Sequence, residues 1–225
     1  MINRWSHSRL STYESCPKKA FYRYVKKHPE ESHPAAERGI KIHNLAEQYI
    51  KGELPEMPKE LYLFYEGFEQ LREEYERGDV CVEEQWAFNL SWEKTEWDSE
   101  DTWGRYIVDA FVQNGNTAKV IDFKTGRYKE YNENYKNQCA LYACCVFNRF
   151  PELETIQTEL WYLDHHKITR YSFTRKEAKE TQKDFHKRGL TMTTDEVFAT
   201  APSEFSCRFC SFTNICKDNF YERKT

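Results

Sequence analysis

The stretch "VIDFKTG", Val120–Gly126, decides the fold of this chain. An apolar run carries an acid and a lysine two residues apart and closes on Thr-Gly, which is typical of the end of a buried strand. Residues two apart in a strand share a face, so Asp122 and Lys124 point one way while Ile121 and Phe123 point the other. The pair is either an ordinary ion pair on a strand face or a pair that carries chemistry.

A second acid lies in the run that precedes this strand. Asp109 sits inside "GRYIVDAFVQ", and the turn sequence "QNGNT" is short enough to join the two runs as a hairpin. In that hairpin Asp109 and Asp122 would lie close together on one face, where two carboxylates repel unless a cation lies between them. Oxygen ligands suit Mg²⁺ or Mn²⁺, so we expect a divalent ion here, with Lys124 beside it to orient a nucleophile and stabilise charge on a phosphate.

Three more polar residues are candidates for the same site. Gln138 and Tyr142 are four apart in "NYKNQCALYA", so they share a helical face that can reach the open end of the sheet. His43 in "GIKIHNLAEQ" can supply an imidazole to the ion. Each also has a plain structural explanation: a solvated glutamine, a packed tyrosine and a helical histidine with no metal.

Composition limits the classes of function. The chain has 225 residues, enough for one main domain, and its formal net charge of -4 excludes binding to polyanions through a general excess of positive charge. Any interaction with nucleic acid must therefore depend on a local site. The first residues lack the apolar run of a secretory signal and no stretch approaches eighteen apolar residues, so we expect a cytoplasmic protein with no membrane partner.

The order of periodic segments predicts an α/β fold. Helical patterns occupy residues 8–27, with Ser11 and Glu14 as a possible capping box, then 35–50 and 59–77. Three strand patterns follow, then a helix over 133–150, two strands joined near 164–166, and a helix from Thr174 to Gly189. We predict one domain on a central mixed sheet, with an N-terminal helical part (1–78), a catalytic core (79–190) and a cysteine tail (191–225) packed on the first helices.

The tail carries a cysteine pattern typical of a metal site. "CRFCSFTNIC" places Cys207, Cys210 and Cys216 in a C-x2-C-x5-C run, whose first two thiolates can face one ion or cluster. Cys16 is the natural fourth ligand, because the other four cysteines fall in strand or helix patterns that suit small buried side chains. Zinc and an iron-sulfur cluster both remain open from spacing alone.

Taken together, six segments resemble the successive motifs of PD-(D/E)XK nucleases of the RecB and AddB type. They are "SHSRLSTYESCPKKAFYRY", "GIKIHNLAEQ", "WGRYIVDAF", "VIDFKTG", "NQCALYA" and "CRFCSFTNIC". The resemblance spans residues 6 to 216 and is strongest to the compact exonucleases associated with CRISPR loci and to their phage-borne relatives.

The resemblance implies a restriction-endonuclease-like core and a full set of site residues. It implies metal ligation by His43, Asp109 and Asp122, catalysis by Lys124 with support from Gln138 and Tyr142, and a [4Fe-4S] cluster on Cys16, Cys207, Cys210 and Cys216 that fastens the two chain ends together. Asp122 stands where many relatives carry glutamate, which shortens that ligand arm.

For function, the resemblance implies a metal-dependent DNA exonuclease that prefers single strands. Lys18, Lys19 and Arg23 lie among aromatic residues and can pair with phosphates, although a solvated helix face explains them as well. Partner proteins of a recombination, replication or CRISPR adaptation complex are expected, in the host cytoplasm if the protein is phage-encoded. The competing hypothesis is a catalytically idle DNA-binding or scaffolding subunit with a structural iron-sulfur or zinc site.

Overall fold

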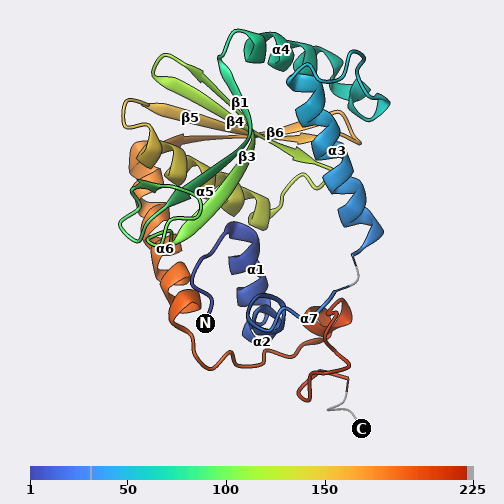
Figure 1. Cartoon of the computed structure of the whole chain (residues 1–225), viewed down its shortest axis with the longest axis vertical. Coiled ribbons are helices and arrows are strands. Elements are labelled where there is room, and N and C mark those ends of the chain that lie inside the picture. Colours follow the sequence, from blue (N-terminus) through green and yellow to red (C-terminus); the bar gives the residue numbers. More distant parts are fainter. Residues whose placement is uncertain (31, 222–225) are drawn as a thin grey trace.

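A six-stranded mixed sheet forms the centre of the molecule. The computed structural model describes residues 1–30 and 32–221 (Figure 1). The strands are β1 (Val80–Phe88), β2 (Lys94–Thr95), β3 (Gly104–Asn114), β4 (Thr117–Lys124), β5 (Thr155–Tyr162) and β6 (Lys167–Thr174). Their order in the sheet is β2-β1-β3-β4-β5-β6, and all neighbours are antiparallel except β4 and β5, which are parallel. The predicted α/β class with a mixed sheet is confirmed.

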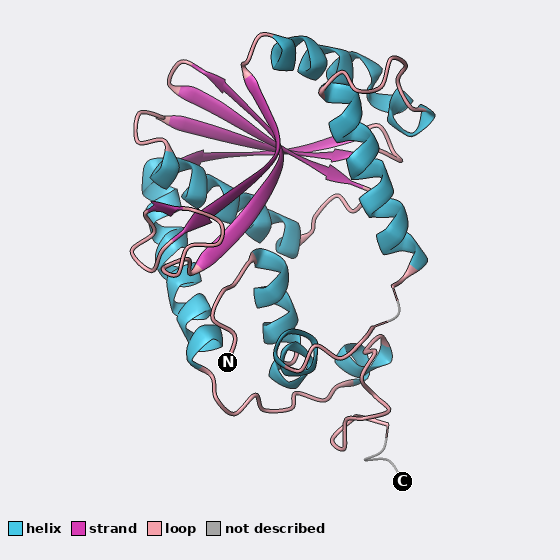
Figure 2. Ribbon diagram, in the orientation of Figure 1, coloured by secondary structure: helices cyan, strands magenta, loops and turns pink. Residues whose placement is uncertain are grey.

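Helices cover both faces of this sheet (Figure 2). They are α1 (His7–Ser15), α2 (Pro17–Ala20), the π-helical turn η1 (Phe21–Val25), α3 (Pro34–Ile50), the 3-10 segment η2 (Lys59–Phe64), α4 (Tyr65–Glu76), α5 (Glu133–Arg149), α6 (Arg175–Thr194) and α7 (Glu204–Arg208). Buried residues of α1, α5 and α6 share one core cluster, and those of α3, η2 and α4 share another with Phe123 and Trp161. The predicted helix over 59–77 is thus a 3-10 turn followed by an α-helix.

Helix α5 joins the two parallel strands. Parallel neighbours need a long crossover, and α5 provides it between β4 and β5. Asn132 caps its first turn by accepting hydrogen bonds from the backbone N–H groups of Asn134 and Tyr135. Residues 139–147 are buried without interruption, because the helix lies between the sheet and α6. This burial fixes the rotation of α5 and with it the direction in which its polar residues point.

Strand β1 changes the face that it presents halfway along its length. Val80 and Val82 pack into the cluster of α3 and α4, whereas Trp86 and Phe88 pack into the cluster of α1, α5 and α6. All four have even numbers, so a regular strand would place them on one face. The change of face occurs at Glu83, whose backbone φ of 51° lies in the left-handed region.

The first helices and the segment that follows α6 lie side by side at the lower end of the view in Figure 1. The hydroxyl of Tyr13 in α1 donates to Asp195 at 2.7 Å, just beyond α6. The rings of Phe21 and Phe198 are 5.2 Å apart and those of Tyr22 and Phe212 are 5.5 Å apart. These contacts hold residues 195–216 against the first helices.

Two predicted helix boundaries are wrong, for identifiable physical reasons. Helix α1 begins at His7 with Ser6 as its N-cap, so Ser11 lies inside the helix and forms no capping box with Glu14. Helix α6 is capped by Thr174 as predicted, with a complete capping box, but it continues past Gly189 to Thr194. Within the described part of the chain, no helix is long and apolar enough to span a bilayer.

Gly189 serves close packing rather than helix termination. A Cβ atom at this position would lie 2.9 Å from the indole rings of both Trp5 and Trp103, which is closer than side-chain contacts allow. Trp5 is almost fully buried and stacks on Phe185 with ring centroids 6.1 Å apart, so it has little freedom to retreat. The absence of a side chain is therefore required at a buried point of helix α6.

We predict that Gly189→Ala lowers the free energy of unfolding by about 1–3 kcal/mol, the usual cost of overpacking. Helix propensity alone would instead raise it by about 1 kcal/mol. Urea unfolding distinguishes the two signs, with the exposed Lys187→Ala on the same helix as a control expected within about 0.5 kcal/mol of wild type. A Gly189→Ala protein that is more stable than wild type would contradict this packing account.

Candidate active site

An open cleft lies where the predicted site residues converge. Its volume is about 640 Å³, and its walls come from α1, α3, α5 and the central strands β1, β3 and β4. All six predicted site residues line it: His43, Asp109, Asp122, Lys124, Gln138 and Tyr142. The strands and the helices packed on them thus bring residues separated by up to 99 positions in the sequence into one cleft.

Strand register places the two aspartates opposite each other. Ala110 on β3 pairs with Ile121 on β4, so the next pair along the hairpin is Asp109 and Asp122. Both are buried, with 7% and 4% of their surface exposed. Asp109 accepts a hydrogen bond of 2.6 Å from the backbone N–H of Phe123, which ties its carboxylate to the neighbouring strand. Two acids at a buried strand pair require a nearby positive charge.

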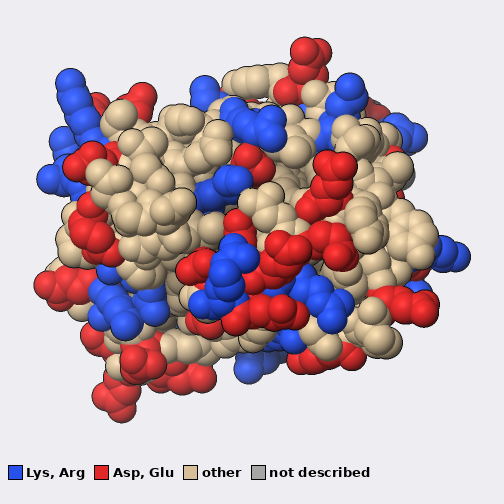
Figure 3. All heavy atoms as spheres, turned by 90° about the horizontal axis from the view of Figure 1, so that it is seen from above, with Lys and Arg blue, Asp and Glu red and all other residues tan. Residues whose placement is uncertain are grey.

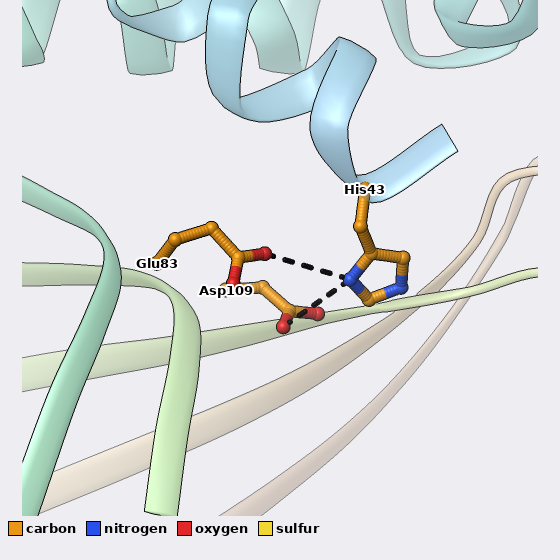
Figure 4. Close-up of side chains that lie close together, drawn as sticks. All are labelled: His43, Glu83 and Asp109. Atoms are coloured by element: carbon orange, nitrogen blue, oxygen red, sulfur yellow. Dashed lines mark ion pairs between the residues drawn. The ribbon is translucent and has the colours of Figure 1, made fainter. Parts of the chain in front are cut away.

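His43 presents one ring nitrogen to these acids in a defined tautomer. Its Nε2 lies 2.9 Å from the carbonyl oxygen of Phe123, which can only accept, so Nε2 carries a proton. Its Nδ1 lies 3.4 Å from Asp109 and 3.6 Å from Glu83 (Figure 4). A histidine whose distal nitrogen is held by a carbonyl is oriented as a metal ligand, with the other lone pair available to an ion.

Glu83 completes this group and was missed by the sequence analysis. Ligand atoms of His43, Glu83 and Asp109 all lie within 4.8 Å of one another, the only such group of three or more His, Cys, Asp or Glu in the described ranges. Glu83 faces Asp109 across β1 and β3 and adopts the left-handed backbone noted above. Such a conformation costs about 1–3 kcal/mol in a residue other than glycine and is concentrated at functional sites.

The charges of this group are unbalanced without a cation. Burial and repulsion by Asp122 raise the pKa of Asp109 to about 6. Burial lowers the pKa of His43, but hydrogen bonding to Asp109 and Glu83 outweighs it and raises the pKa to about 10. The repulsion that raises the pKa of Asp109 and the carboxylates that raise the pKa of His43 both reflect an excess of negative charge at this position. A protonated His43 offsets part of that charge. The donor set of one imidazole and two carboxylates fits a divalent ion, whose binding would release that proton.

Asp122 belongs to a second network, next to the metal-binding group. Its Oδ1 accepts from Gln138 Nε2 and from the Tyr142 hydroxyl, each at 3.0 Å. Its Oδ2 has no aligned hydrogen-bond donor, although the ammonium group of Lys124 is in ion-pair contact with it. The predicted third ligand therefore lies beside the group of His43 and Asp109, and its Oδ2 is in contact with the ammonium group of Lys124.

Lys124 is held in place from three sides. Its ammonium group contacts Asp122, donates to Gln138 Oε1 at 3.0 Å, and lies 4.5 Å from the centre of the Tyr135 ring. Burial lowers the pKa of Lys124, but the attraction of Asp122 outweighs it and raises the pKa above its ordinary value. The lysine thus remains a cation, suited to stabilising negative charge on a phosphate rather than to acting as a base.

Glu83 provides a direct test of the metal-binding group. We predict that Glu83→Gln weakens Mn²⁺ binding about tenfold or more, because it removes one of two carboxylates around a single ion. Isothermal titration calorimetry measures the effect. Glu84→Gln removes an equal charge from the exposed neighbour and should leave affinity unchanged. Equal Mn²⁺ affinity in Glu83→Gln and wild type would refute the role assigned to Glu83.

The four predicted cluster cysteines meet at a different place. Cys16, Cys207, Cys210 and Cys216 line one small hollow between α2 and the tail, and none forms a disulfide. No three of their sulfurs lie within 4.8 Å of one another. Burial raises the pKa of Cys216, and the nearby thiols of Cys16 and Cys210 raise it further. The tail and the first helices therefore share a thiol-lined site at the end of the molecule away from the sheet.

The basic residues predicted to bind DNA lie near this thiol hollow. Lys18 and Lys19 line it, and neither lines the catalytic cleft. Arg23 forms a bidentate ion pair with Glu30, at 2.5 Å through each nitrogen. Figure 3 shows acidic and basic side chains interspersed on one face of the molecule, without a broad basic surface on that face.

A mixed sheet that carries an acid pair, an imidazole and a lysine in one cleft defines the class of PD-(D/E)XK nucleases. The chain belongs to the PD-(D/E)XK nuclease superfamily, whose family model matches residues 4–217. No protein with a curated description matches it in sequence.

The fold of this chain is similar to the folds of proteins of known structure. A protein from Eubacterium rectale whose name is "putative exonuclease" shares 15% identity and a TM-score of 0.56, over 96% of this chain and 90% of that one. The protein SSO0001 shares 17% identity and a TM-score of 0.52, over 96% of this chain and 87% of that one. At these identities the likeness concerns the fold.

Proposed function

We propose that this nuclease is a divalent-metal-dependent DNA exonuclease that prefers single strands and hydrolyses phosphodiester bonds in the cleft between α1, α3 and the sheet. The observation that carries the proposal is the convergence of the half-buried His43 and Glu83 and the buried Asp109 on one position in the cleft that Lys124 also lines. A structural role would not need three charge-bearing ligands and a half-buried ammonium group around an open cleft.

The residues divide the chemistry between them. His43, Glu83 and Asp109 would hold Mg²⁺ or Mn²⁺, with Asp122 beside them, and such an ion polarises a phosphoryl oxygen and lowers the pKa of a bound water. Lys124 is placed to stabilise the charge that develops on the phosphate. Gln138 and Tyr142 fix the Asp122 carboxylate through its Oδ1 and leave its Oδ2 facing Lys124.

The competing idea of an idle scaffolding subunit has less support. A site that no longer catalyses a reaction often loses its lysine or one of its acids, because buried charges destabilise the fold and are then kept for no function. Here Asp109 and Asp122 are buried, Lys124 is half-buried, and all three are in contact with charged partners. Exonuclease action is proposed from the sequence resemblance and is consistent with the name of the Eubacterium rectale neighbour, "putative exonuclease".

End-labelled DNA tests this function directly. We predict that linear single-stranded DNA is degraded with Mg²⁺ or Mn²⁺ and not with EDTA, and that circular single strands resist. Asp109→Ala and Lys124→Ala should each lower the rate by about 10²–10³-fold or more, because each removes a charge on which the transition state depends. Lys119→Ala, on the same strand as Lys124 but outside the cleft, is the matched control. Activity that survives EDTA, or alanine variants that cut as fast as wild type, would refute the assigned site.

We further propose that Cys16, Cys207, Cys210 and Cys216 bind a [4Fe-4S] cluster that fastens the chain ends. The support is the convergence of four thiols in one hollow. Zinc bound by thiolates at about 2.3 Å would need its sulfurs about 3.8 Å apart, whereas no three of these sulfurs lie within 4.8 Å of one another. Four cysteine ligands are the usual set for such a cluster. Lys18 and Lys19 would then offset the charge of the thiolates rather than bind DNA.

A cysteine variant separates this structural role from catalysis. We predict that anaerobically purified protein is brown, and that Cys210→Ala loses the colour together with about 2 kcal/mol of stability, which lowers Tm by about 4–8 °C. Nuclease activity measured well below Tm should change little. Cys81→Ala, a half-buried cysteine of β1, should keep the colour. A colourless wild-type protein with stoichiometric zinc would contradict the cluster.

A further inference from the structure

Part of the wall of the catalytic cleft is basic, and neither the metal-binding group nor the lysine network uses it. Arg4, Arg9 and Arg105 line the same cleft as the carboxylates. Arg105 is the second residue of β3 and lies four residues before Asp109, or roughly 13 Å along the strand. The cleft therefore has an acidic centre at Asp109 and a basic wall at Arg105, and the distance between them is comparable to the length of a few nucleotides of a bound strand.

Two of these arginines converge on a single carboxylate. Asp98, in the loop between β2 and β3, lies 2.6 Å from a terminal nitrogen of Arg105 and 3.9 Å from one of Arg4. Its side chain is 82% exposed, so the ion pairs are weak and the carboxylate is easily displaced. Two guanidinium groups around one exposed anion have the arrangement of a phosphate site that is filled by a side chain.

The guanidinium groups are positioned without the help of this carboxylate. Arg4 donates to the carbonyl oxygen of Ser99 at 2.7 Å, and Arg105 donates to that of Trp97. Arg105 also lies 4.7 Å from the centre of the Trp97 ring, and its buried Nε has no hydrogen-bond partner among the described residues. Both cations would therefore keep their places, with donors available, if the Asp98 side chain swung away.

A second hollow continues from this wall. Arg4 and Arg9 line both the catalytic cleft and an adjoining cavity of about 390 Å³ at the start of the chain. Arg9 also lies 5.0 Å from the centre of the Tyr24 ring, and that ring lines the adjoining cavity. A bound strand that leaves the metal centre past Arg105 and Arg4 thus finds further space bordered by a cation and an aromatic ring.

We propose that Arg4 and Arg105 form a phosphate-binding subsite for the nucleic-acid strand, and that the Asp98 carboxylate occupies this subsite until a substrate phosphate displaces it. The proposal rests on the proposed nuclease function and adds to it the place where the strand is gripped beyond the cleaved bond. The proposal also gives the acidic loop between β2 and β3 a role, because the Asp98 carboxylate in this loop competes with the substrate for the two arginines.

The test is the binding of a fluorescein-labelled oligothymidylate, followed by anisotropy with Ca²⁺ in place of Mg²⁺ and at several salt concentrations. Asp98→Ala should bind about threefold more tightly, because an exposed ion pair no longer competes. Arg4→Gln and Arg105→Gln should bind more weakly, and each should reduce the slope of log K against log salt by about 0.7, the value for one phosphate contact on a single strand. Arg4→Lys should keep most of that slope.

Two controls separate a local subsite from general charge effects. Glu96→Ala removes an equal charge from an exposed position on the same loop, where the described residues form no ion pair with it, and it should leave binding unchanged. Arg77→Ala removes an exposed arginine at the end of α4, outside the cleft, and should keep the salt slope.

Unchanged or weaker binding by Asp98→Ala would overturn the subsite, and so would an equal gain in Glu96→Ala. Asp98 is exposed, so its variant decides the question even if an arginine variant fails to fold. A wild-type protein that binds no DNA would instead overturn the proposed function itself.

Discussion

The repulsion among carboxylates at the middle of a buried sheet is the constraint on which the rest of the structure depends. Neighbouring strands bring Glu83, Asp109 and Asp122 together, and two of these acids are almost fully buried. Such an arrangement is stable only with positive charge at the same place. The protein supplies His43 from helix α3 and Lys124 from the sheet itself, and the proposed ion position lies among His43, Glu83 and Asp109.

Each flanking layer has a defined task in this arrangement. Helix α3 delivers His43, whose Nε2 is fixed by the Phe123 carbonyl, so that Nδ1 faces the acids. Helix α5 delivers Gln138 and Tyr142, which hold the Asp122 carboxylate from the other side. Because α5 is buried along nine consecutive residues, its rotation is set by packing, and the polar side chains follow. The packing of α5 in the core therefore also determines where Gln138 and Tyr142 lie in the site.

Much of the fold and of the candidate site could be predicted from local sequence patterns. Alternating runs and the "QNGNT" turn indicated the hairpin that brings Asp109 opposite Asp122, and the spacing of Gln138 and Tyr142 indicated their shared face. Glu83 could not be found in this way. Its place depends on the pairing of β1 with β3 across a long connection and on a left-handed backbone that no pattern specifies. The only signal was an interruption of apolar alternation in "VCVEEQW".

The measurement that tests the central claim most directly is anomalous X-ray scattering from crystals soaked in Mn²⁺. The account predicts a manganese peak at ligand distance, about 2.0–2.3 Å, from His43 Nδ1 and from carboxylate oxygens of Glu83 and Asp109. A peak that is absent from this position, or that lies elsewhere in the molecule, would contradict it.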